Sequence, residues 1–386
     1  MRGAPALCDA GTVRNYHIVE LDQPRDDAPG AILTAFQGVE ALERDFDLAR
    51  HGNDDQTDPA AAMLSQYRPS SDSEYVWLLA IAGDAPAGST TGRFGLLVLR
   101  PDDALVPTDV VGAVNFALPL RDNRDAVQDI MMHVRPQWRR HGIGHALQTA
   151  VEQVAALRGR TVLQGYSDAR ASQAADALHP ARGPFAIEPD EGTAFALAMG
   201  YQLAQAERHS VQDLTAYDFA APVSPDGYRI ETWTGRTPEP LRTHMAEMLR
   251  VMSMAAPAGD FHFEEEIWDA ARVSAMDDEV LDAREAIVSL AIHERTGEAA
   301  GLSQLYRTIG KPAVVDQWNT VVAAGHRGHS LGLVLKQANL VRLADVWPEA
   351  RRVHTWNATE NDYMWAINER LGYRTENIDA GWQKRL

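Results

Sequence analysis

The chain has 386 residues, of which 45% are hydrophobic, and its formal net charge at pH 7 is −18. This length allows sizeable cores and indicates two or three domains, while the acidic balance argues against broad binding to nucleic acid or anionic membranes. The single cysteine, Cys8, excludes an internal disulfide framework and a cysteine-based zinc cluster. Because no apolar run is long enough to span a membrane and the N-terminal region lacks the plan of a signal peptide, we expect a soluble, cytoplasmic protein.

The first half of the chain is predicted to begin with a strand and a helix and to continue with strands joined by hairpins. Apolar runs bounded by Gly, Pro and Asp indicate strands, and apolar residues at helical spacing indicate helices. The expected strands are 13–21, 75–82, 93–100, 110–118, 126–134, 161–165 and 211–214. The expected helices are 36–50, one that begins near Ile143, and 193–199, which ends at Gly200 as its C-cap.

The composition changes at residues 220–227, where two prolines and a glycine interrupt the apolar periodicity. We therefore expect a linker there, between an N-terminal domain at 13–219 and a C-terminal domain at 228–386. In the second half the expected strands are 228–233, 286–294, 301–309, one that starts at Asp316, a short one after the next helix, and 381–383. The expected helices are 239–254, 264–273, one after the turn at 326–332, and one that ends at Leu371-Gly372-Tyr373.

A turn of small and basic residues lies between a strand and a helix in each half. The first reads Arg139-Arg140-His141-Gly142-Ile143-Gly144, and the second reads Arg327-Gly328-His329-Ser330-Leu331-Gly332. Backbone N–H groups at a helix start are unpaired and the helix dipole favours an anion, so each turn is a candidate phosphate site. Because the turns lie about half a chain apart with similar elements around them, the sequence indicates duplicated domains.

These motifs resemble the signature of the GNAT superfamily of acetyl-CoA-dependent acyltransferases, Arg/Gln-x-x-Gly-x-Gly/Ala at a strand-to-helix junction. The second turn carries Ser330 where the family prefers glycine, and this half also resembles the family's ending in its asparagines and Leu371-Gly372-Tyr373. The duplicated arrangement is similar to the tandem type to which mycothiol synthase belongs. The resemblance implies an α+β fold (α/β mixed sheet) of two tandem GNAT-fold domains, each a central, mostly antiparallel sheet flanked by helices.

The resemblance implies acetyl-CoA as the cofactor, with its diphosphate held by backbone N–H groups of a turn. It also implies that the N–H of Val134 or Val322 donates to the thioester oxygen as it becomes an oxyanion. The implied cofactor-binding residues are Val322, Arg327, Gly328, His329, Ser330, Leu331, Gly332, Leu333, Asn357 and Asn361 in the second half, and Val134, Arg139, Arg140, His141, Gly142, Ile143, Gly144 and His145 in the first.

The resemblance also suggests catalytic residues. Histone-type members carry a glutamate base at the position of Asp316, which is Gln128 in the first half; the alternative for Asp316 is a strand-start residue that faces solvent. Many members have a tyrosine that protonates the leaving thiolate, but Asn368 and Ala196 stand at that position here. Tyr363, on the neighbouring turn, is the candidate substitute, with packing against the cofactor or the core as the alternative.

Only the second half combines Asp316 with the asparagine pair, so we expect the C-terminal domain to be catalytic. The N-terminal domain would bind cofactor without turnover or serve as a scaffold. The predicted function is an N-acetyltransferase, which transfers an acetyl group from acetyl-CoA directly to a primary amine of a small molecule. The alternative is a non-catalytic acyl-CoA-binding or sensing protein, suggested by the missing tyrosine. A doubly wound nucleotide-binding protein is disfavoured, because hairpins precede each turn.

Two further features leave alternatives open. The run Glu264-Glu265-Glu266 is either a solvated helix start or part of an acceptor groove that attracts a cationic amine. The histidines show no ligand spacing beside acidic residues, so no metal is predicted. The expected partner is a small-molecule amine acceptor, with no nucleic acid and no membrane, and the chain is expected to be a monomer or a homodimer.

Overall fold

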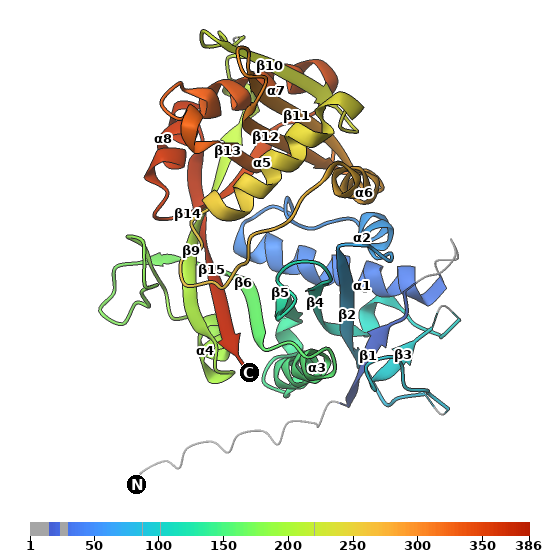
Figure 1. Cartoon of the computed structure of the whole chain (residues 1–386). Coiled ribbons are helices and arrows are strands. Elements are labelled where there is room, and N and C mark those ends of the chain that lie inside the picture. The colour runs from blue at the N-terminus through green and yellow to red at the C-terminus, as the bar shows by residue number, and fades with distance from the viewer. Residues whose placement is uncertain (1–14, 24–29, 87, 101, 220) are drawn as a thin grey trace.

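The structure is a computed structural model, and it describes residues 15–23, 30–86, 88–100, 102–219 and 221–386 (Figure 1). Cys8, the first two residues of the strand expected at 13–21 and the first residue of the expected linker lie outside this part of the chain. The described residues form an α+β fold around a mixed 13-stranded sheet, with a separate two-stranded sheet of β7 (Ala171–Ser172) and β8 (Ala186–Ile187).

The helices flank this large sheet on both faces. The strands of the first half are β1 (Tyr16–Leu21), β2 (Ser73–Ala82), β3 (Leu97–Leu99), β4 (Val110–Pro119), β5 (Ala126–Val134), β6 (Val162–Ala169) and β9 (Gln202–Asp213). Those of the second half are β10 (Tyr228–Thr234), β11 (Arg284–His293), β12 (Ala299–Thr308), β13 (Val314–Val322), β14 (Arg352–Ala358) and β15 (Arg374–Arg385). The helices are α1 (Gly30–Arg50), α2 (Ala60–Gln66), α3 (Ile143–Leu157), α4 (Glu191–Ala198), α5 (Arg242–Ala255), α6 (Ala270–Leu281), α7 (Leu331–Val346) and α8 (Asp362–Arg370).

The two halves exchange their last strands. The sheet order is β10-β11-β12-β13-β14-β9-β15-β6-β5-β4-β2-β1-β3, so β9 of the first half pairs with β14 and β15 of the second half pairs with β6. The two exchanged strands also pair with each other, antiparallel, at the centre of the sheet. Each half thus repeats the same strand plan outward from this central pair. The division at residues 220–227 stays a prediction from the sequence, since the hydrogen bonding of β9 and β15 crosses it.

The helices form equivalent layers in the two halves. In the first half α1 and α2 cover one face of the sheet and α3 covers the other. In the second half α5 and α6 cover one face, while α7 and α8 cover the other. Figure 1 shows α1 and α2 facing α5 and α6 between the two halves. Of the helices in the described residues, none has both the length and the apolarity that crossing a bilayer requires.

Several expected boundaries were wrong for identifiable reasons. The helix expected at 264–273 begins only at Ala270, because residues 261–269 run extended onto the first half, where the backbone N–H of Glu264 donates to Asn123 Oδ1 at 2.6 Å. Strand β9 covers 202–213 rather than 211–214. Several of its additional residues, including His209 and Gln205, are polar but buried, because they meet polar partners of the other half.

Candidate functional site

The two predicted turns have the same backbone conformation. Each has left-handed residues one and three positions after the motif arginine: Arg140 (φ 62°) and Gly142 (φ 86°) in the first half, Gly328 (φ 85°) and Ser330 (φ 58°) in the second. The halves have therefore exchanged which of the two positions carries glycine. The substitution of serine for glycine, which the sequence showed, does not change the path of the chain.

The motif arginines fasten the turns to the preceding strands. Arg139 Nε donates to the carbonyl oxygen of Val134 at 3.3 Å, and Arg327 Nε makes the matching contact with Val322 at 3.5 Å. Arg139 also pairs with Glu191 at 3.4 Å, whereas Arg327 has no acidic partner within 4 Å among the described residues. No side chain caps α3 or α7, so the N–H groups at both helix starts are open to an anion. The two turns therefore differ in the ion pair of the motif arginine, while the first turn carries a second arginine, Arg140.

The predicted cofactor residues divide into two kinds. Ile143, Leu331 and Leu333 have their side chains in the cores, so only their backbone N–H groups could reach a ligand. Gly332 lies where a Cβ atom would come within 3.2 Å of Ile367, so its small size allows α7 and α8 to approach each other. The histidines of the turns, His141, His145 and His329, are exposed at the surface, as are Gly328 and Ser330. Gly144 lies against Phe195 of α4 in the same way as Gly332 against α8.

Strands β13 and β14 pair in parallel only at one end and then separate. The paired residues run from Val314 to Gln317 opposite 352–355. Asn357 lies just beyond this paired region, and its Oδ1 accepts a hydrogen bond from Asn368 Nδ2 at 2.6 Å. The amide nitrogen of Asn357 is thereby left to donate elsewhere. Asn361 is the N-cap of α8, where its Oδ1 accepts from the N–H of Met364 at 3.2 Å, so it has a structural role of its own.

A buried lysine supports this pair of asparagines and was not anticipated from the sequence. Lys336 is 1% exposed, and its Nζ donates to Asn368 Oδ1 at 2.7 Å. Burial lowers the pKa of Lys336 to about 7. A lysine on the sheet-facing side of a helix whose other positions there are mostly apolar is the signal that could have revealed it. The chain Lys336–Asn368–Asn357 fixes the asparagine side chain at the point where the strands separate.

Asp316 lines a cavity of about 190 Å³ where the two halves meet. Its neighbour Val315 belongs to the core under α7 and α8, so the Asp316 side chain points to the opposite face of the sheet. Burial raises the pKa of Asp316, against the opposing effect of Arg284 and His354. Its carboxylate has no hydrogen bond or ion pair with another described residue. A half-buried carboxylate without a partner, beside the gap between two strands, is suited to take up a proton.

Tyr363 does not lie with Asp316. It is 59% exposed in the first turn of α8, a helix on the other face of the sheet, and it does not line the cavity. Asn368 occupies the position of the usual tyrosine but is buried in the chain with Lys336. The predicted base, Asp316, and the predicted acid, Tyr363, therefore lie on opposite faces of the sheet.

At the positions that match Asp316 and Lys336, the first half has neutral side chains, Gln128 and Gln148. Gln128 bonds with Gln164 at 3.3 Å and has no acidic function. Gln148 stands where the second half has Lys336, and it bonds with Tyr201 Oη at 3.2 Å and with Glu152 at 3.0 Å. Asp129, next to Gln128, has a φ of 55° and a pKa raised by burial, which the sequence did not indicate. A carboxyl group is thus present in the first half, but one position away.

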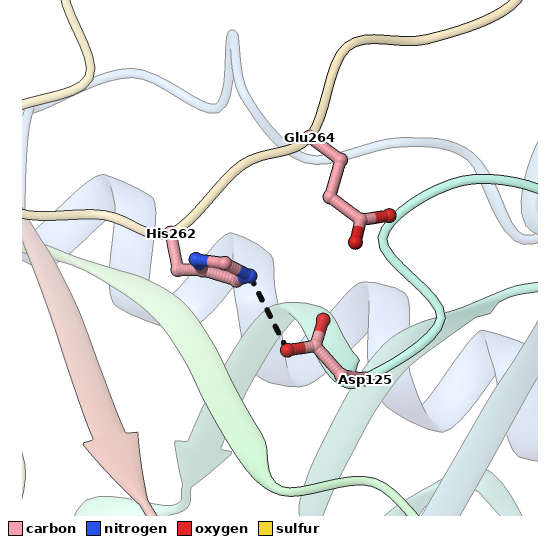
Figure 2. Close-up of side chains that lie close together, drawn as sticks. All are labelled: Asp125, His262 and Glu264. Carbon is pink, nitrogen blue, oxygen red and sulfur yellow. Dashed lines mark ion pairs between the residues drawn. The ribbon is translucent and has the colours of Figure 1, made fainter.

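Three side chains with metal-ligand chemistry meet where the α5–α6 connection crosses onto the first half. Asp125, His262 and Glu264 each offer an atom within 4.8 Å of the others (Figure 2). His262 Nε2 pairs with Asp125 at 3.3 Å, while Glu264 Oε2 accepts the N–H of Asn123 at 2.8 Å. These contacts join the α5–α6 connection of the second half to residues 123–125 of the first half.

No protein-family model matches this sequence, and no curated protein does so either. Solved structures do match. A tandem GNAT protein from the clavulanic acid biosynthesis pathway is 26% identical with a TM-score of 0.68, and the alignment covers 96% of this chain and 98% of that one. A GCN5-related N-acetyltransferase from Sphaerobacter thermophilus has a TM-score of 0.55 at 16% identity, with 95% of both chains covered.

The repeated sheet, the strand exchange and the paired turns define a tandem GNAT-fold protein. Together with the similarity over nearly the whole chain, they show that this chain has the GNAT fold in its two-domain form, similar to that of the tandem GNAT protein. This confirms the family and fold predicted from the two motifs. The class is that of acyl-CoA-dependent acetyltransferases. The particular likeness to mycothiol synthase stays a prediction.

Proposed function

We propose that the protein transfers an acetyl group from acetyl-CoA to a primary amine of a small molecule, and that the second half carries out this reaction. The observation that carries the proposal is the position of Asp316 in a cavity beside the separating strands β13 and β14, on the face opposite α7. The cofactor would approach from the turn at the start of α7 and the amine from the cavity. The two reactants would then meet between the strands.

We assign the following roles to residues of the second half. Backbone N–H groups of residues 328–333 hold the diphosphate, helped by the positive end of α7. Asn357 donates its amide hydrogen to the pantetheine arm, and the N–H of Val322 stabilises the oxyanion. When the amine nitrogen attacks the thioester carbon, the C–N bond forms and the C–S bond breaks. The proton of the amine passes to Asp316, and the thiolate takes up a proton from water to leave as free CoA.

The first half is proposed to bind cofactor without turnover or to act as a scaffold. Its turn has the same backbone, with Arg139 partly neutralised by Glu191, so a phosphate group could still bind. It lacks an acidic residue at the position of Asp316 and the asparagine pair. The non-catalytic alternative for the whole chain is still supported by one observation, which is the exposed position of Tyr363 away from the cavity.

Release of free CoA from acetyl-CoA, measured with a thiol reagent against a panel of primary amines, tests the proposal. Amine-dependent release would support it, with the constant signal of Cys8 subtracted. Tight binding of acetyl-CoA by calorimetry, without turnover on any amine, would favour the sensing alternative instead.

A further inference from the structure

The cavity that holds Asp316 is built by both halves of the chain. Its walls come from β11 to β14 of the second half and from the α1–α2 connection of the first half, residues 51–59. Asp58 of this connection accepts a hydrogen bond from Thr308 Oγ1 at 3.0 Å and lies 3.6 Å from Arg284. Lys311 Nζ donates to the carbonyl oxygens of Asp54 and Asp55. The first half thus forms one wall of the site in the second.

One of the carboxylates in the cavity is already neutralised. Asp55 is 5% exposed, and its carboxylate is held by the guanidinium of Arg352 and by His354 Nε2 at 3.1 Å. The pKa of Asp55 is depressed because these two partners outweigh the effect of burial. Asp55 therefore anchors the connection and offers no free charge to a ligand.

The charges that remain are balanced. Two carboxylates, Asp58 and Asp316, and two cations, Arg284 and Lys311, line the cavity. Arg284 is bound only loosely to Asp58, and its buried Nε has no hydrogen-bond partner among the described residues. Asp316 likewise has none. The cavity is therefore lined by one carboxylate without a partner, Asp316, and by the guanidinium of Arg284, which has only the long contact with Asp58 and lies over the ring of Trp318. A ligand that carries a cation and an anion together would satisfy both groups.

The size of the cavity restricts the ligand further. At about 190 Å³ it is small. Sites for drug-sized molecules usually measure about 300–1,000 Å³. Trp356 adds an aromatic side chain to the wall, beside the point where β14 leaves β13. These features suit a compact molecule with a short carbon skeleton.

We propose that the acceptor is a small zwitterionic amine, such as an amino acid, with its amino group at Asp316 and its carboxylate at Arg284 and Lys311. The inference rests on the proposed function and names the substrate class of that same site. It gives the first half a part in catalysis in the second half, because residues 51–59 close the cavity and set the charge around Arg284. A simple polyamine is disfavoured, since it would place its second cation against Arg284 or Lys311.

Matched pairs of amines test the proposal with the full-length protein and acetyl-CoA: alanine against ethylamine, and lysine against 1,5-diaminopentane. Each pair differs only in the carboxylate. We expect kcat/KM to be about tenfold or more higher for the carboxylate-bearing member, the size that one charged hydrogen bond provides. Arg284→Gln should bring the two values to within about threefold, with KM for acetyl-CoA unchanged. Arg250→Gln, an exposed arginine paired with Glu265 on the outside of α5, is the matched control and should keep the preference.

Asp58→Asn provides a second test, in which binding of the carboxylate-bearing amine should become stronger. Removal of this carboxylate frees the guanidinium of Arg284, so KM for the carboxylate-bearing amine should fall. A preference for the plain amines, or an unchanged preference in active Arg284→Gln, would overturn the zwitterion assignment while the proposed function stands. Absence of turnover on every amine would instead overturn the proposed function, and the inference would fall with it.

Discussion

The two halves share a backbone plan but differ in what lies beneath the helix that follows each turn. Under α3 the facing side chains are apolar, including Leu147, Val151 and Ile130, and Gln148 is satisfied by its own neighbours. Under α7 the interior contains Lys336 and Asn339, each almost fully buried. A buried lysine is unfavourable for stability. Its presence in one copy only is a difference on which the proposal of a catalytic second half can be tested.

The largest expected effect comes from substitution of the proposed general base, Asp316. Asp316→Asn should lower kcat by about 10²- to 10⁴-fold, the usual contribution of a general base. Gln128→Ala, at the matching position of the first half, should leave kcat within about twofold, measured by CoA release under the same conditions. In the wild-type protein activity should fall as pH falls through the raised pKa of Asp316, because the base must be unprotonated. Full activity of Asp316→Asn would exclude the assignment.

The two connections that cross between the halves should differ in strength. Asp55 is buried against Arg352 and His354, so Asp55→Ala should reduce the free energy of unfolding by about 3–5 kcal/mol. Asp125→Ala removes an exposed ion pair with His262 and should change the free energy of unfolding by less than about 1 kcal/mol. Urea denaturation measures both.

The effect at Asp55 should also depend on pH. Since the folded pKa of Asp55 lies below its ordinary value of 3.8, the stabilisation is present above pH 4 and is lost as pH falls further. The difference between wild type and Asp55→Ala should therefore shrink in acid. A difference of equal size at pH 3 and pH 7 would contradict this account.

Lys336 should give the second half a distinct pH dependence. Its folded pKa is about 7 and its ordinary value is 10.5, so between these values the unfolded chain holds a proton that the folded chain lacks. Stability should then rise with pH across this window, by at most about 1.4 kcal/mol per pH unit. Lys336→Met should remove this rise, as seen by urea denaturation at pH 7.5 and 9. Gln148→Met, at the matching position in α3, is neutral in both forms and should leave the rise unchanged.

The smallest effect is expected in the turns. Ser330→Gly removes the cost of a left-handed residue and should raise the free energy of unfolding by up to about 1 kcal/mol, while Gly142→Ala should lower it by about 1–2 kcal/mol. Affinity for acetyl-CoA, measured by calorimetry, should change less than about threefold in Ser330→Gly if backbone N–H groups hold the diphosphate. A larger loss would show that the Ser330 hydroxyl is itself a ligand.

The sequence by itself determined the local elements and their repetition. Strand and helix periodicity, the two turns and the ending at Leu371-Gly372-Tyr373 were sufficient to predict a mixed, mostly antiparallel sheet and the GNAT family. These features are local, since a left-handed position or an apolar face depends on neighbours in the chain. Because these features are local, the sequences of the two turns could be compared without knowledge of any tertiary contact.

Only the tertiary structure decided how the halves combine. The exchange of β9 and β15 joins strands that lie in different halves of the chain, and the polar residues of β9 gave no strand pattern because most of them are buried against the other half. Lys336 reads as an ordinary helical lysine until Asn368 is placed beside it. The cavity at Asp316 likewise depends on residues 51–59, which local patterns assign only to the first half. Such sites arise from long-range contacts, whose partners local periodicity does not specify.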